Sequence, residues 1–356
     1  MPVLSKTAQV EQRLRRSILC GEWAPGTHLP GERDMLSLFG VSRTTLRDAL
    51  TSLASQGLIE RKQKSGTYVS TALGTTTVAI VANADLLTAS TSYYFRRLVQ
   101  EARRLIRESG RRPVAAYGHG NTLQACLDSI DVLTRPAEGK LLGVLSTMPL
   151  GSAAERLKEA GISAVDIGAG LPVGKHSVIF DYARLTEMGA QRLLSAGYAD
   201  FAVMCVHPAS GETDMEANGL GEMLLHLQEK AVDFRADRLI PVPGSYDLKQ
   251  TYHIFKQVWA SAKRPRAIFF CDDGICDVAT RAILELGIKV PEELAIVTHA
   301  NKGRTFHFPV PLTCVEFDPA AAVRAAWGML EKLMTGERVD DPVVRIPPHW
   351  REGKSV

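Results

Sequence analysis

The chain has 356 residues, of which 45% are hydrophobic and 23% are charged. This composition is typical of a folded globular protein, and the length is enough for two or three domains. No stretch reaches the about 18 apolar residues of a membrane-spanning helix, and the N-terminal residues lack the apolar segment of a secretory signal. We therefore expect a cytoplasmic protein with no membrane partner.

Six cysteines are scattered along the chain and form no CxxC pair. This spacing favours reduced thiols over a disulfide framework, and we expect neither a metal nor a cofactor. The net charge of +3 is unevenly distributed: residues 1–75 contain ten Lys/Arg and six Asp/Glu and carry +4, whereas the rest of the chain carries −1. A polyanionic partner is expected to bind the N-terminal part.

The first 71 residues predict three helices and a two-stranded wing. The helices are expected at 8–20, 31–40 and 43–56, and glycines end each of them. Ser42 is a good N-cap for the third helix. Leu46, Ala49, Leu50 and Leu53 recur at helical spacing, so this stripe should be buried. Strands at 58–63 and 67–70 flank a glycine turn and predict a hairpin.

The exposed face of the third helix carries arginine and threonine, which suit a DNA groove. Arginine can grip guanine edges or phosphates, and threonine can bond a phosphate or contact a thymine methyl. A merely solvated face is the alternative, but the serine cap, the basic wing and the charge asymmetry together favour DNA. The expected contacts to duplex DNA are Arg33, Ser42, Arg43, Thr44, Thr45, Arg47, Lys64, Gly66 and Thr67.

This region resembles the winged helix-turn-helix of the GntR family. The resemblance lies in G-x-x-x-P-G-x-x-L-P (21–30), in VSRTTLRDAL (41–50), in GLI (57–59) and in GTYV (66–69). It implies that Arg33, Arg43 and Arg47 contact DNA and that Gly66 is the contact at the wing tip. Lys64 departs from the family pattern, because many members carry a second wing glycine there.

Residues 72–77 are small and polar and predict a linker, and residues 78–356 alternate apolar strands with amphipathic helices. Apolar runs such as 78–83, 113–118, 141–146, 201–206, 267–272 and 294–299 are typical of buried parallel strands. The fold class is therefore α/β, with parallel doubly wound sheets behind the N-terminal module. Helices are expected near 92–109, 121–134, 152–160, 183–196, 215–230, 248–262, 275–286 and 319–335.

We find no catalytic motif and expect no enzyme. The glycine-rich segment 168–174 has no strong strand before it, which favours a loop over a phosphate-binding turn.

Residues 76–356 resemble the periplasmic-binding-protein-like core of LacI/GalR regulators. The resemblance is carried by segments 77–110, 178–204, 266–297 and 318–337. GntR proteins usually carry a helical effector domain instead, so this hybrid resembles the arabinose-repressor type of regulator. It implies a two-lobed domain with its first crossing near 181, a homodimer, and a small effector, most simply a sugar or sugar derivative, bound between the lobes.

The expected effector contacts are Tyr94, Phe95, Asp85, Ser146, Asp181, Asn218 and Asp273. By resemblance Asp273 accepts a hydrogen bond from an effector hydroxyl, although Asp272 and Asp273 could equally cap a helix. Tyr94 and Phe95 suit stacking on a sugar or purine, and core packing is the alternative for Phe95.

The remaining effector candidates have mixed or weaker assignments. Asp85 and Ser146 end strands, and Asp181 has a mixed hinge and ligand role. Asn218 stands where many family members have an arginine, and His299-Ala300-Asn301 replaces an aspartate pair.

The sequence thus predicts a bacterial DNA-binding regulator, by default a repressor, controlled by a small molecule. One alternative is a DNA-binding regulator whose α/β domain serves only dimerisation and has lost its effector. A second is a solute-binding or enzymatic α/β domain to which DNA is secondary.

Overall fold

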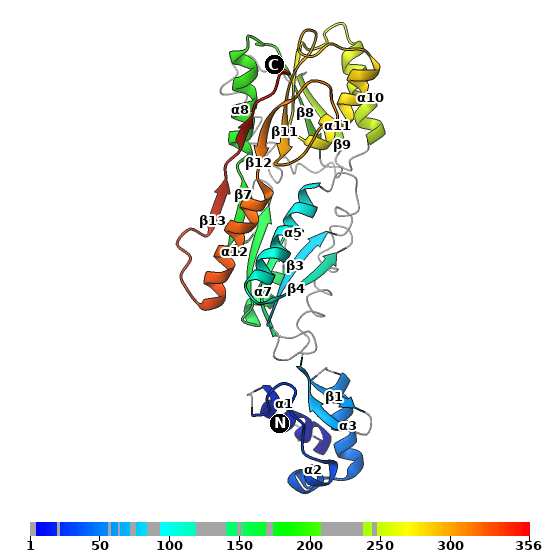
Figure 1. Ribbon diagram of the computed structural model, residues 1–356, viewed down its shortest axis with the longest axis vertical. Coiled ribbons are helices and arrows are strands. Elements are labelled where there is room, and N and C mark those ends of the chain that lie inside the picture. Colours follow the sequence, from blue (N-terminus) through cyan, green and yellow to red (C-terminus); the bar gives the residue numbers. More distant parts are fainter. Residues whose placement is uncertain are drawn as a thin grey trace.

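The computed structural model describes residues 5–19, 22–55, 58–62, 65–71, 76–83, 93–118, 140–147, 150, 152–168, 174–207, 238–243 and 248–356. An N-terminal module of helices and a short hairpin is followed by two lobes, each built on its own sheet (Figure 1). The α/β class with parallel sheets is confirmed.

The N-terminal module is a winged helix-turn-helix. The stripe of Leu46, Ala49, Leu50 and Leu53 is buried against the first two helices, because only one face of this helix is apolar. Its elements are α1 (Lys6–Leu19), α2 (Glu32–Phe39), α3 (Arg43–Ser55), β1 (Ile59–Lys62) and β2 (Gly66–Val69).

A short extended segment before α2 ties the wing to the helices. The N–H of Leu29 donates to the carbonyl of Thr67, and the N–H of Val69 donates to the carbonyl of Thr27, each at 2.8 Å. β1 and β2 pair antiparallel, so β2 is the central strand of a small three-stranded arrangement, between β1 and the segment 27–29. These backbone bonds tie β2 to the segment that leads into α2.

The first lobe contains a six-stranded, all-parallel sheet in the order β13-β7-β6-β5-β3-β4. Alternate residues of its strands enter two cores: Val78 and Ile80 pack toward α5 and α12, whereas Ala79 and Val81 pack with residues of α7. The elements are β3 (Thr76–Asn83), α5 (Tyr93–Glu108), β4 (Arg112–Gly118), β5 (Lys140–Ser146), α7 (Ser152–Glu159), β6 (Ser163–Gly168), β7 (Ser177–Phe180), α12 (Pro319–Thr335) and β13 (Val343–Ile346).

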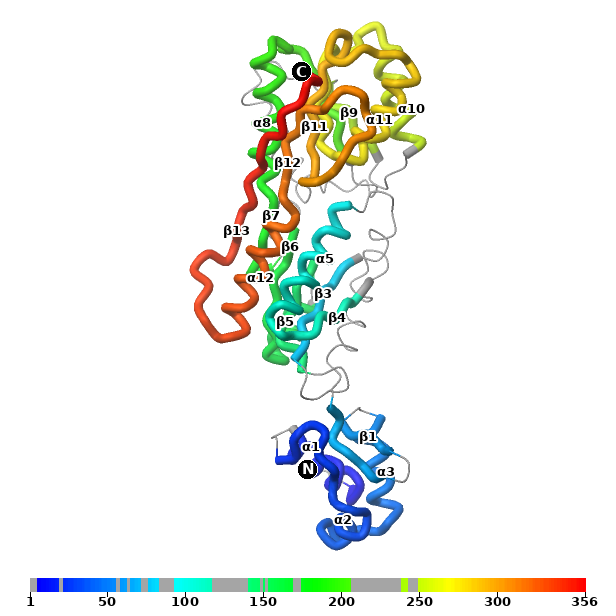
Figure 2. The backbone as a smooth tube through the Cα atoms, in the orientation of Figure 1, coloured from blue at the N-terminus to red at the C-terminus, as the bar shows by residue number. Residues whose placement is uncertain are grey.

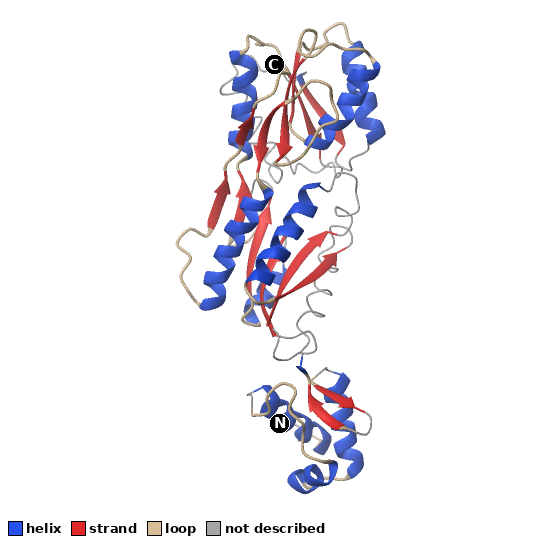
Figure 3. Ribbon diagram, viewed as in Figure 1, coloured by secondary structure: helices blue, strands red, loops and turns tan. Residues whose placement is uncertain are grey.

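The second lobe contains a six-stranded sheet in the order β14-β12-β11-β10-β8-β9, in which only the β12–β14 pair is antiparallel. In both lobes, helices pack against the sheet (Figure 3). The elements are α8 (Tyr182–Ser195), β8 (Ala202–His207), β9 (Leu239–Pro243), α10 (Leu248–Ala260), β10 (Ala267–Phe270), α11 (Asp273–Glu285), β11 (Ala295–Asn301), β12 (Thr313–Phe317) and β14 (His349–Arg351).

Within the ranges that the structure describes, the backbone passes between the lobes three times, and these crossings lie side by side in Figure 2. It leaves the first lobe after β7, returns between β12 and α12, and crosses again between β13 and β14. A change in the separation of the lobes would bend the chain at these connections and leave each sheet intact.

Some expectations differ from the structure, and others lie outside the described residues. The segment 168–174 does follow a strand, β6, whose apolar run is interrupted by Asp166 and is therefore a weak strand signal in the sequence. β3 begins at Thr76, inside the predicted linker, because its two threonines pair with β5. The helices expected near 121–134 and 215–230 fall outside the described part of the chain.

Candidate nucleic-acid interface and effector site

The start of α3 is fixed by the turn that precedes it. Gly40 adopts the left-handed conformation (φ 61°) that ends α2, and Ser42 Oγ accepts a hydrogen bond from the N–H of Thr45 at 3.2 Å. The hydroxyl groups of Ser42 and Thr45 also bond to each other at 2.9 Å. These two hydroxyls therefore order the first turn of α3, and Thr45 is only half exposed.

Four further predicted DNA contacts are exposed side chains: Arg33, Arg43, Thr44 and Arg47. Arg43 Nε lies 2.9 Å from Glu32 Oε1, and both side chains are solvent-accessible. Such an exposed ion pair contributes little to stability, so it can open when a phosphate replaces the carboxylate. It holds the Arg43 guanidinium beside α2 in the free protein.

A hollow of about 240 Å³ lies between α2, α3 and the wing. Arg47 from α3 and Gly66 and Thr67 from the wing line it, so the fold brings together three of the predicted contacts. Arg61 of β1 also lines it and donates to the carbonyl of Arg47 at 3.5 Å. Arg61 is not among the contacts predicted from the sequence, although the basic run RKQK (61–64) that begins with it indicates a charged wing.

The wing tip combines a special backbone with an aromatic support. Gly66 has φ 115°, and a Cβ at this position would collide with His28 Nε2. The His28 ring packs edge-on against Tyr68, with centroids 4.8 Å apart, and Lys62 Nζ lies 4.9 Å from the centre of the Tyr68 ring. The predicted contact Lys64 lies outside the described residues.

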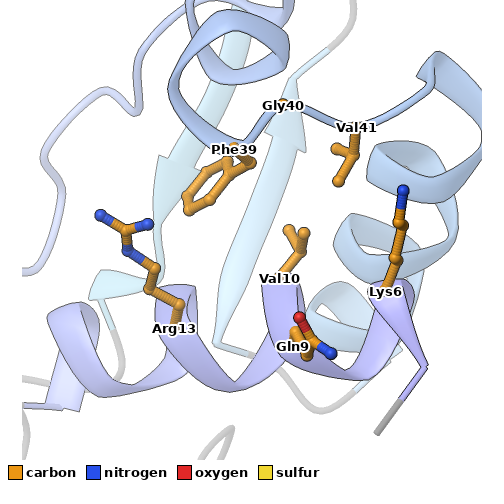
Figure 4. Close-up of a pocket in the computed structure, with 7 residues that line it drawn as sticks. All are labelled: Lys6, Gln9, Val10, Arg13, Phe39, Gly40 and Val41. Carbon is orange, nitrogen blue, oxygen red and sulfur yellow. The ribbon is translucent and has the colours of Figure 1, made fainter.

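A second hollow of the module, of about 200 Å³, lies between α1 and the turn that joins α2 to α3 (Figure 4). Val10, Phe39 and Val41 form its apolar part. The Arg13 guanidinium carbon lies 5.4 Å from the centre of the Phe39 ring, a cation–π contact that keeps this charge close to the surface of the domain.

In the second lobe, the two aspartates at the start of α11 have separate tasks. Asp272 Oδ1 accepts hydrogen bonds from the N–H groups of Gly274 and Ile275 at 2.8 and 3.0 Å, so Asp272 is the helix cap. Burial and the neighbouring Asp273 raise the pKa of Asp272.

Asp273 is buried and points to the end of β11. Its Oδ2 accepts a hydrogen bond from Asn301 Nδ2 at 3.1 Å and lies 3.6 Å from Arg304 Nε. Asn301 thus pairs with the candidate ligand Asp273, and the sequence offered no sign of this because the two residues are 28 positions apart.

An aromatic cluster lies where the lobes meet. Tyr94 contacts Phe180, Phe180 contacts Phe317, and Phe317 contacts both Tyr182 and His299, with ring centroids 4.8 to 5.6 Å apart. The rings come from α5, from the ends of β7 and β12, and from α8 and β11. Burial raises the pKa of Tyr94 and lowers that of His299, so both rings are neutral at pH 7.

The other predicted effector contacts are dispersed. Phe95 packs edge-on against Tyr94 at 4.8 Å, and Ser146 is fully buried at the end of β5. Asp181 caps α8, since its Oδ1 accepts from the N–H of Arg184 at 3.0 Å, and its own N–H donates to Ile346 of the third crossing. Asp85 and Asn218 lie outside the described residues.

Among the described residues, no group of three His, Cys, Asp or Glu side chains is arranged to hold a metal ion. The helices that the structure describes include none with the length and apolarity needed to cross a membrane.

Two parts of the chain match described families. Residues 6–69 match the family described as bacterial regulatory proteins, gntR family, and residues 190–356 match the family described as periplasmic binding protein-like domain. The chain therefore joins a gntR-type winged helix-turn-helix to a periplasmic-binding-protein-like domain, and the expected fusion is confirmed.

Curated relatives are transcriptional regulators. The chain is 44% identical over 61 residues to the uncharacterized HTH-type transcriptional regulator YisV of Bacillus subtilis, a match to 17% of this chain and 13% of that protein. It is 22% identical over 273 residues to the HTH-type transcriptional repressor PurR of Salmonella paratyphi B, covering 76% of this chain and 78% of the repressor. These matches are to regulators of transcription and not to enzymes.

Solved regulator structures share the fold. The transcription regulator CcpA of Lactococcus lactis matches with a TM-score of 0.65 and 17% identity over 79% of this chain and 99% of its own. A complex of the transcriptional regulator CelR with cellobiose matches with a TM-score of 0.62 and 20% identity over 92% of this chain and 100% of its own. The lac repressor dimer bound to operator matches with a TM-score of 0.64 and 16% identity over 79% of this chain and 94% of its own.

Proposed function

We propose that this chain is a cytoplasmic transcriptional regulator that binds operator DNA through α3 and the wing, and that a small polar effector bound between its lobes sets its operator affinity. The effector assigned by this proposal is a sugar or sugar derivative, and the default action is repression. The observation that carries the proposal is the joining of an exposed Arg/Thr helix face to a two-lobed domain in one chain.

The DNA-binding half rests on geometry and charge. The N-terminal residues of α3 are exposed, and Arg47, Arg61, Gly66 and Thr67 line one hollow beside them. A helix of this kind fits the major groove, and a glycine at the wing tip lets the backbone approach the DNA closely. The +4 charge of residues 1–75 supplies the general attraction to phosphate.

The effector half rests on polar groups near the crossings between the lobes. Asp273 is buried and hydrogen-bonded to Asn301, so its orientation is fixed before a ligand arrives. A carboxylate held in this way can accept a further bond from a hydroxyl group through its other oxygen. The cellobiose complex of CelR supports a saccharide as the ligand class.

The alternative, an α/β domain that serves only dimerisation, is not favoured. The buried pair of Asp273 and Asn301 would be an expensive feature in a scaffold, since polar groups in a core cost stability relative to well-packed apolar groups. A homodimer is part of the proposal, because two-fold operators match two-fold proteins and the lac repressor relative is a dimer on its operator.

The test is a measurement of operator binding with and without saccharides. An operator is first selected from random duplex DNA, and its affinity for the full chain is followed by fluorescence anisotropy during titration with mono- and oligosaccharides. We expect one saccharide class to change the operator dissociation constant by about five- to 150-fold, and the operator to change saccharide affinity by the same factor. Failure to select any DNA sequence contradicts the DNA half, and operator binding that no saccharide alters contradicts the effector half.

A further inference from the structure

A cavity of about 620 Å³ opens on the face of the first lobe that α7 covers. Residues of α7, of β6 and of the segment 174–176 line it, and its size is that of a small-molecule site. Its polar groups come from the first lobe, whereas Asp273 and Asn301 belong to the second. The cavity is therefore separate from the proposed effector site.

Asp166 is a buried residue of the lining of this cavity. Its position in β6 places it on the same face as Ala164, which packs with the α7 core, and only 7% of the residue is exposed. In the part of the chain that the structure describes, no group donates a hydrogen bond to its buried Oδ1. A Cβ on Gly174 would collide with its Oδ2, so Gly174 leaves this carboxyl group its space.

A buried carboxyl group without a partner is costly, and a ligand that enters the cavity can supply the missing partner. Burial alone raises the pKa of Asp166 to about 7. The charged and titratable groups around it are Glu155 and Lys158 on α7 and Lys175 and His176 before β7. Lys158 Nζ lies 3.7 Å from Glu155 Oε2 and both side chains are largely exposed at the rim, whereas Asp166 is buried.

We propose that this cavity is a second ligand site, which binds a small molecule through a primary ammonium group paired with Asp166. An ammonium group provides both the positive charge and the hydrogen bond that the buried carboxylate lacks, whereas a neutral hydroxyl provides only the bond. A bare divalent cation does not fit the site, since it needs several oxygen ligands and the described residues offer one buried carboxylate. Lys158 and Lys175 at the rim favour an anionic group at the far end of the same molecule.

The test compares probes that differ only in the proposed group. Binding of 6-aminohexanoate and of 6-hydroxyhexanoate, and of butylamine and 1-butanol, is measured by calorimetry with the full chain at pH 8. We expect each amine to bind at least tenfold more tightly than its hydroxyl counterpart, and Asp166→Asn to remove that preference. Asp273→Asn, at the proposed effector site, should leave it unchanged.

A pH dependence and a cavity variant provide two further tests. The affinity of 6-aminohexanoate should rise between pH 6 and pH 8, as the Asp166 carboxyl ionises, and this rise should vanish in Asp166→Asn. If Asp166→Asn does not fold, Ala154→Leu, which narrows the cavity from α7, replaces it and should lower amine affinity at least tenfold. Equal affinity within each pair, an amine preference that survives Asp166→Asn, or an amine affinity that is unchanged in Ala154→Leu overturns the proposal. Operator binding by Asp166→Asn should match that of the unmodified chain, so failure here is distinct from failure of the regulator function.

Discussion

The hydroxyl group of Tyr93 donates a hydrogen bond to the backbone carbonyl of Lys302 at 3.1 Å and so joins the two lobes. Tyr93 begins α5 in the first lobe, and Lys302 follows β11 in the second. The next residue, Gly303, has φ 89°, and a Cβ there would collide with the Tyr93 hydroxyl. Lys302 Nζ also lies 3.1 Å from Asp318 at the second crossing, so one short segment contacts both the facing lobe and a hinge.

Tyr93→Phe should shift the lobes toward a more open arrangement. A hydrogen bond of this kind contributes about 0.5–1.5 kcal/mol, so its loss should change the equilibrium between lobe arrangements about two- to tenfold. Amide hydrogen exchange at residues 302–304 should speed up, and the radius of gyration from small-angle scattering should increase. Tyr252→Phe, a tyrosine of α10 whose ring lies beside Lys256, serves as the control. Unchanged exchange in Tyr93→Phe would show that the bond does not hold the lobes.

The sequence predicted the winged helix well because its signals are local. Helical spacing places Leu46 and Leu50 in the core, and the same spacing leaves Arg43 and Arg47 exposed. Ser42 caps α3 through a bond over three residues, which a short motif can encode.

The junction of the lobes could not be predicted in the same way. Phe180 and Phe317 meet there although 137 positions separate them, because β7 and β12 both end at a crossing. The link between Tyr93 and Lys302 spans 209 positions. Such contacts depend on the order of strands in two sheets, and periodicity along the chain carries no information about that order.

Arg47→Ala tests the exposed face of α3. If Arg47 grips a base edge, the substitution should weaken operator binding by about 1–3 kcal/mol, or about five- to 150-fold, and relax the preference for one base. Fluorescence anisotropy against the selected operator and its single-base variants measures both effects. Arg281→Ala removes an exposed arginine of α11 in the second lobe and should leave binding unchanged. Operator affinity equal to that of the unmodified chain would remove Arg47 from the interface.

Lys64→Ala tests the wing in a different way. A lysine that contacts phosphate adds affinity without sequence preference, so its loss should weaken all duplexes alike. The slope of log affinity against log salt should become shallower by about one unit, because one fewer counterion is released. Anisotropy titrations between 50 and 200 mM salt give this slope. An unchanged slope in Lys64→Ala would show that Lys64 contacts no phosphate group of the DNA.

Substitutions of the adjacent residues Asp272 and Asp273 at the start of α11 should distinguish a helix-capping role from a ligand-binding role. Asp272→Ala removes the cap bonds to Gly274 and Ile275 and should lower the free energy of unfolding by about 0.5–2 kcal/mol. Asp273→Asn retains the size of a side chain that contacts Asn301 and Arg304, yet it should abolish the response of operator affinity to the saccharide. Urea unfolding and the operator assay distinguish the two variants. If operator affinity still responds to the saccharide in Asp273→Asn, the Asp273 carboxylate does not bind the saccharide and its role is structural.

The pH dependence of the free energy of unfolding should report the protonation of Asp166 even without a ligand. Its pKa is raised to about 7 in the folded chain by burial, and the value in the unfolded chain is about 3.9. The folded state therefore binds more protons between these values, so the stability supplied by the protonated group is complete below about pH 4 and is lost as the pH rises through about 7.

Relative to Asp166→Asn, the free energy of unfolding of the unmodified chain should fall with increasing pH, by up to about 1.4 kcal/mol per pH unit within that window. The comparison with Asp166→Asn removes the contribution of His176, whose pKa is lowered by burial and by Lys175 and which titrates in both proteins. Urea unfolding at pH 5, 6, 7 and 8 provides the curve. Parallel curves for the two proteins would mean that the Asp166 carboxyl is ionised at all of these pH values and already has a partner. A saturating amine probe should flatten the difference at pH 7, because it stabilises the carboxylate form that burial disfavours.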